Sequence, residues 1–122
     1  MPARRDVSGF IRSTFRSVWA LELLCFLRKA PERSWDRAEL VAALRASDLV
    51  IEQSLAALTA AGLVVMLTED QAKYQPASAA LDALAREAEA QYASSPDKVR
   101  RLIVTGDGGL SAFADAFRVR RD

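Results

Sequence analysis

The sequence contains no histidine and a single cysteine, and these two absences exclude several kinds of site. Without histidine, the chain lacks the side chain that most often acts as a general base and most often binds a metal. One cysteine cannot form an internal disulfide, and zinc sites built from Cys and His are excluded. No nucleophile–base pair is recognisable. We therefore expect that the chain is not an enzyme and that it uses no metal or other cofactor.

Glycine and proline are also scarce, with five and four among 122 residues. Alanine and leucine dominate instead, and both lose little conformational freedom in a helix, which predicts a mainly α domain. No run of about 20 uncharged apolar residues is long enough to span a membrane. The basic start of the chain lacks the apolar stretch of a signal peptide. We expect one cytoplasmic domain without membrane contact.

Apolar spacing predicts a long first helix over residues 9–29, which ends before Pro31 because the residue preceding a proline avoids the helical region. Asp36 and Glu39 have the spacing of a capping box. They predict a second helix that begins after Asp36 and runs to about Arg45.

Two tryptophans and the cysteine in the first part of the chain are expected to pack against other apolar side chains. Cys25 and Trp19 belong to a nearly continuous apolar run, which favours a place in the core. Trp35 precedes the predicted N-cap and can form a hydrophobic staple with Leu40. A ligand-stacking role for either tryptophan is the alternative.

Ser47 is the expected N-cap of a third helix, and Gly62 is expected to end it in the left-handed conformation. The β-branched, apolar run 63–67 and the segment 72–75 before Pro76 predict a two-stranded hairpin.

Further helices are predicted after the hairpin. Ser78 can cap a fourth helix, and Ser95 before Pro96 can begin a fifth. The glycine-rich stretch 105–109 predicts a loop, and the apolar side chains of 110–117 predict a short final helix. A basic tail follows.

The segment that closes the third helix has the pattern L-x-x-L-x-x-x-G-L-V, formed by Leu55, Leu58, Gly62, Leu63 and Val64. Together with the order helix, helix, turn, helix, hairpin, it resembles bacterial winged helix-turn-helix transcription regulators of the MarR and PadR kind. The resemblance covers residues 17–76. It implies a basic N-terminal arm over 1–16, a winged core, and C-terminal helices over 77–122.

In such regulators the third helix lies in the major groove of double-stranded DNA, and this resemblance implies a set of contacts here. Polar residues of the third helix would face bases, the hairpin would supply one cation, and flanking arginines would contact the backbone. The implied DNA-binding residues are Arg12, Arg16, Arg37, Arg45, Ser47, Gln53, Thr59 and Lys73.

The charge distribution leaves a second hypothesis open. No Arg or Lys lies between Arg45 and Lys73, and residues 47–92 hold two cations and seven carboxylates, a net charge of −5. Carboxylates are repelled by a polyanion. The alternative to DNA binding is therefore a winged helix that docks a protein partner through an acidic third helix.

The apolar surface outside the winged core suggests a homodimer, because regulators of this type usually dimerise through such helices. Residues 1–16 and 79–117 would form the contact. The alternative is that these helices fold back onto their own domain.

Overall fold

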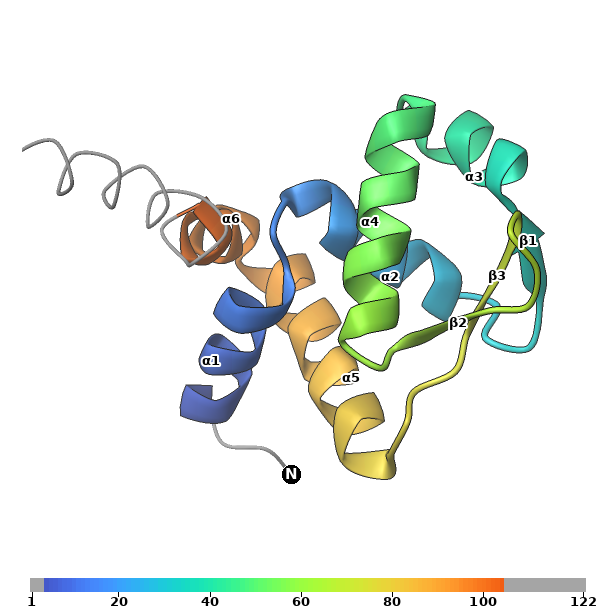
Figure 1. The fold of residues 1–122 in the computed structure, drawn as a ribbon. Coiled ribbons are helices and arrows are strands. Elements are labelled where there is room, and N and C mark those ends of the chain that lie inside the picture. Colours follow the sequence, from blue (N-terminus) through green and yellow to red (C-terminus); the bar gives the residue numbers. More distant parts are fainter. Residues whose placement is uncertain (1–3, 105–122) are drawn as a thin grey trace, which may run out of the picture.

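The structure is a computed structural model that describes residues 4–104, and Figure 1 shows their arrangement. The sheet and α3 lie at one end of the molecule, α1 and α6 lie at the other, and α2 and α4 lie between them. The predicted loop 105–109, the helix 110–117 and the basic tail lie outside the described residues. The elements in chain order are α1 (Arg4–Thr14), α2 (Val18–Arg28), β1 (Ser34–Asp36), α3 (Arg37–Leu44), α4 (Asp48–Ala60), β2 (Val64–Met66), β3 (Gln71–Tyr74), α5 (Ala79–Ser94) and α6 (Pro96–Val104).

The predicted continuous helix over 9–29 is wrong, because α1 and α2 are separate helices. Ser17 is extended, and its side chain accepts a hydrogen bond from the Ala20 N–H at 3.3 Å, which caps α2. Phe15 at the break is buried and meets the ring of Phe10 edge to face, with 5.8 Å between centroids. The apolar spacing continues through the break because both helices bury a face.

The ends of α3 and α4 follow the predicted caps. The Glu39 carboxylate accepts a hydrogen bond from the Asp36 N–H at 2.9 Å, and Ser47 Oγ accepts one from the Val50 N–H at 3.1 Å. Gly62 has a φ of 79°, in the left-handed region that ends a helix. Arg45, after α3, has a φ of 55° and is also left-handed.

The predicted two-stranded hairpin is part of a three-stranded antiparallel sheet with the order β1-β3-β2. Trp35 pairs with Ala72, and Val65 pairs with Lys73. The added strand, β1, spans three residues, too few to show an alternating pattern in the sequence. It attaches the segment before α3 to the hairpin.

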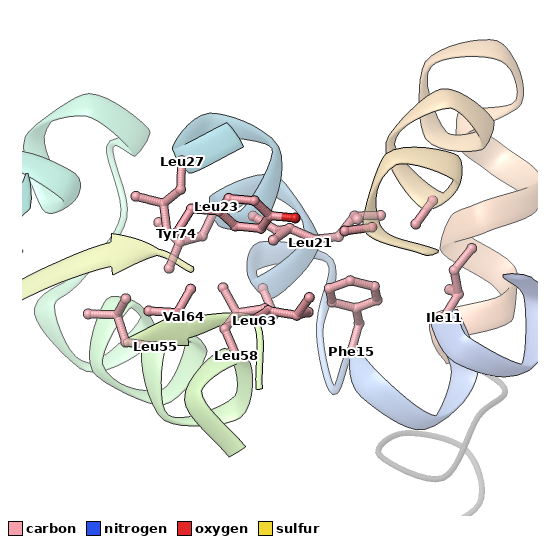
Figure 2. Packing of buried hydrophobic residues seen from close by; sticks show 14 of the residues in the cluster. Ile11, Phe15, Leu21, Leu23, Leu27, Leu55, Leu58, Leu63, Val64 and Tyr74 are labelled. Atoms are coloured by element: carbon pink, nitrogen blue, oxygen red, sulfur yellow. The ribbon is translucent and has the colours of Figure 1, made fainter. Parts of the chain in front are cut away.

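The core extends through the described residues from Val7 to Ile103, and α2, which contacts α3, α4, α5 and β3, contributes buried side chains along most of its length. Figure 2 shows Leu21, Leu23 and Leu27 of α2 facing side chains of α4 and the strands, such as Leu58 and Tyr74. Toward the other end, the buried side chains of α1 and α5 continue the same cluster.

The terminal helices pack onto their own domain. Helix α1 contacts both α5 and α6, and α5 also contacts α2. Of the two alternatives for these helices, folding back therefore holds for residues 4–14 and 79–104, while the predicted homodimer stays a prediction. None of the helices in residues 4–104 is long and apolar enough to cross a lipid bilayer.

Candidate functional site

Helix α4 presents one face to solvent over its whole length. Ile51, Leu55 and Leu58 point into the core, which turns the opposite side of the helix outward. Leu49 stands on this outward side with 59% of its surface exposed. The exposed residues of α4, which we call the α4 face, are Asp48, Leu49, Glu52, Gln53, Ala56, Thr59 and Ala60.

Two of the three polar side chains that were predicted to contact DNA from this helix, Ser47 and Thr59, form hydrogen bonds with the backbone of the helix itself. Ser47 Oγ accepts the capping hydrogen bond from the Val50 N–H. Thr59 Oγ1 donates to the Leu55 carbonyl at 2.7 Å, so its proton is directed back into the helix. Gln53 is exposed, and its side chain forms no hydrogen bond with any other residue of 4–104. Of the three side chains, only the Gln53 amide extends from the α4 face with all its hydrogen-bonding capacity available.

Arg37, predicted to contact a DNA backbone, is surrounded by carboxylates. Its guanidinium lies 3.3 Å from Asp48 Oδ1, 3.7 Å from Glu52 Oε2 and 3.4 Å from Asp70 Oδ1. The Arg37 backbone N–H also donates to the Asp70 carbonyl at 2.7 Å. Three carboxylates against one guanidinium leave this cluster, which we call the Arg37 cluster, with a net charge of −2. The charge of Arg37 is therefore neutralised by carboxylates at the place where α3, α4 and the hairpin meet.

The remaining predicted cations lie at separate places. Arg12 and Arg16 are exposed at the end of α1 and just after it, and Arg45 is exposed between α3 and α4. Lys73 is half-buried on β3, the middle strand of the sheet. Of these four residues, Arg16 is the one that shares a groove with the α4 face.

That first groove, of about 580 Å³, lies between the start of α2 and α4. Arg16, Ser17 and Gln53 line it together with Trp19. Trp19 is 40% exposed, so its predicted place in the core is wrong. The sequence could not show this because α2 is apolar on most of its circumference, and spacing alone does not reveal which side faces solvent.

A second groove, of about 430 Å³, lies on the other side of α4, against the hairpin. Its lining combines apolar side chains with two carboxylates, one guanidinium and one hydroxyl: Arg37, Glu52, Leu55, Ala56, Thr59, Ala60, Met66 and Glu69 belong to it. Ala56 and Ala60 also line the first groove. Within the α4 face, Ala56 and Ala60 thus form a ridge of small side chains between two hollows.

A separate, half-buried polar cluster connects α2, β3 and α5. Arg28 forms an ion pair with Glu89, and its guanidinium lies 5.6 Å from the ring centroid of Tyr74. The Tyr74 hydroxyl donates to Asp82 at 2.7 Å. Burial, followed by the nearby charge of Glu89, raises the pKa of Cys25 to about 12. This thiol is protonated and unreactive at neutral pH.

Within residues 4–104, no group of three or more Cys, Asp or Glu side chains has an arrangement that could hold a metal ion. Comparison with protein families, curated proteins and solved structures finds no match to this chain. The candidate site therefore has to be judged on its own charge, shape and exposure.

Proposed function

We propose that this chain is a winged helix-turn-helix protein whose α4 face docks a protein partner. The order α3, short turn, α4 and hairpin, with β1 added to the sheet, supports the winged-helix assignment. The observation that carries the proposed docking is the charge of α4: its exposed face has two carboxylates and no cation, and the adjacent Arg37 already has three carboxylates around it.

Such a face is poorly suited to the major groove. Duplex DNA carries about one negative charge per 1.7 Å of its axis, and proteins gain affinity by placing Lys and Arg against the phosphates. Asp48 and Glu52 stand in the first turns of α4, the part of a recognition helix that approaches the bases. Their repulsion from phosphate opposes the docking geometry that the fold would otherwise allow.

The same features suit a protein surface. Leu49 and Leu67 are 59% and 50% exposed, and with Trp19 they are among the few large apolar side chains that the described residues leave in solvent. Two grooves flank the small residues Ala56 and Ala60. Apolar anchors beside pockets are typical of the centre of a protein–protein interface.

A titration of the ¹⁵N-labelled full chain with random-sequence duplex DNA at low salt tests this proposal. The amide shifts of residues 47–60 are expected to stay unchanged, because α4 offers no phosphate contact. Shifts that concentrate in residues 47–53 and disappear as salt rises would overturn the proposal.

Double-stranded DNA binding by the flanking arginines is the second candidate. Arg12, Arg16 and Arg45 are exposed, and Arg16 lies beside the α4 face. Binding to duplex DNA would then weaken with salt by about 0.9 log units of affinity per log unit of salt for each phosphate neutralised. Replacing Arg12 and Arg16 by Ala would lower that slope, whereas Arg101→Ala on α6 would leave it unchanged.

A further inference from the structure

We infer that the groove between α4 and the hairpin receives an amphipathic, Arg- and Lys-rich segment of a partner protein. This inference rests on the proposed function and gives the chemistry of the partner. We call the hollow formed by Arg37, Glu52, Leu55, Ala56, Thr59, Ala60, Met66 and Glu69 the acidic groove.

The floor of the acidic groove is apolar and accessible. Leu55 is buried, Met66 is half-buried, and Ala56 and Ala60 are exposed one helical turn apart. Small side chains at this spacing let a second backbone approach α4 closely. Apolar side chains of a partner helix, three and four residues apart, can then enter the hollow.

The rim of the acidic groove is negative. Glu52 and Glu69 line it from opposite elements, α4 and the turn of the hairpin. Arg37 also lines the groove, and its guanidinium is already surrounded by the carboxylates of the Arg37 cluster, which include Glu52. Together with Glu69, this cluster carries a net charge of −3. The field at the mouth of the groove therefore attracts Arg and Lys and repels phosphate or acidic peptides.

The first groove differs in this respect. Arg16 and Gln53 stand at its edge, and it has no carboxylate among its lining residues. An acidic or neutral segment would suit it better than a basic one. The two sides of α4 thus select different partners, and charge complementarity favours the basic segment for the acidic groove.

A synthetic helical peptide of about four turns is the probe. It carries Leu at positions three and four apart with Arg and Lys beside them. One comparison peptide keeps the Leu positions and replaces every Arg and Lys by Glu. A second has the composition of the probe with its Leu residues scattered around the helix.

Binding is measured by fluorescence anisotropy and located by ¹⁵N amide shifts of the full chain. We expect the basic amphipathic peptide to bind at least about tenfold more tightly than either comparison peptide, a difference of about 1.4 kcal/mol. Only this peptide offers both the cations that pair with the rim and the apolar face that fits the floor. The shifts should centre on Ala56, Thr59, Ala60 and Met66.

Charge reversal provides a matched pair of variants. Glu69→Lys changes the rim of the acidic groove, whereas Glu32→Lys makes the same change at an exposed turn before β1. Glu69→Lys should weaken binding of the basic peptide about tenfold, and Glu32→Lys should leave it unchanged. Both side chains are exposed, so circular dichroism should show the fold retained in each variant.

Other outcomes overturn the inference in distinguishable ways. Equal binding of the scattered peptide would mean attraction by charge alone. Binding of the acidic peptide with shifts around Trp19 and Gln53 would place the partner in the first groove, and the proposed docking by α4 would stand. Concentration-dependent shifts without peptide would make a second copy the occupant. If duplex DNA shifted the amide signals of α4 and none of the three peptides did, the proposed function would be overturned as well.

Discussion

The hydroxyl of Tyr74 belongs to the polar cluster that joins α2, β3 and α5, and the half-buried thiol of Cys25 lies close enough to Glu89 of this cluster to feel its charge. Burial, together with the hydrogen bond to Asp82, raises the pKa of Tyr74 to about 12 from an ordinary value of 10.0. Burial raises the pKa of Cys25 from 9.0 to about 12. Both groups hold their protons more tightly in the folded chain than in the unfolded chain.

The free energy of unfolding should therefore fall as pH rises from about 9 to about 12. In this window the unfolded chain releases the two protons first, and the folded state loses relative stability. Urea denaturation across this range measures the fall. Cys25→Ala combined with Tyr74→Phe should flatten it, and an unchanged slope in this double variant would contradict the assignment.

Arg37 holds three carboxylates together, so its removal should cost more than the loss of one surface ion pair. Arg37→Ala is expected to lower the free energy of unfolding by about 1–2 kcal/mol, because the freed carboxylates then repel one another. Arg86→Ala is the matched control. It breaks a single exposed pair with Asp82, 3.1 Å long, and should cost about 0.5 kcal/mol or less. If urea denaturation gave the same loss of unfolding free energy for both variants, Arg37 would not hold its three carboxylates together as a coupled group.

The role of Arg37 also shows what the sequence cannot predict. The resemblance to DNA-binding regulators implied a backbone contact for this residue. Its carboxylate partners Asp48, Glu52 and Asp70 come from α4 and the hairpin. Such partners are brought together by the fold, and spacing along one helix does not reveal them. The lack of Arg and Lys in α4, by contrast, could be read directly from the sequence.

At the scale of elements, the turn between α3 and α4 contains a strained residue. Arg45 is a non-glycine residue in the left-handed region, with φ 55° and ψ 40°. That conformation costs about 1–2 kcal/mol for a residue with a Cβ. Arg45→Gly should remove this cost and raise the free energy of unfolding by about 0.5–1 kcal/mol after the added flexibility of the unfolded chain is subtracted.

Ala42→Gly provides the control for this prediction. Ala42 is exposed in the interior of α3, so the same glycine should destabilise there by about 1 kcal/mol. Thermal denaturation of both variants would show shifts in opposite directions. Destabilisation by Arg45→Gly would contradict the strain assigned to the turn.

Helix ends were predictable from the sequence where their cause is local. Ser47 and Ser78 accept hydrogen bonds from the Val50 and Leu81 N–H groups, and Gly62 ends the helix that precedes β2. The break between α1 and α2 was not predicted. Phe15 fits the apolar spacing of a continuous helix and is buried, and this spacing outweighed the local capping signal of Ser17 in the prediction.

At the scale of the whole molecule, the two ends of the described part differ in surface character. Helices α1, α5 and α6 pack against one another and extend the core, whereas α4 and the sheet border the α4 face with a groove on each side. The sequence predicted the acidic character of the α4 face but not its grooves, because these form between α4 and elements distant in the chain.

The most direct measurement of protein docking by the α4 face is site-specific photo-cross-linking in the native cell. A photoreactive side chain replaces Gln53 on α4 in one variant and Ala93 on α5 in the control, and both positions are exposed. We expect a discrete protein adduct from position 53 that is absent from position 93 and that decreases when Glu69→Lys is added. Adducts to nucleic acid from position 53, with no protein adduct beyond the control, would contradict the proposed function.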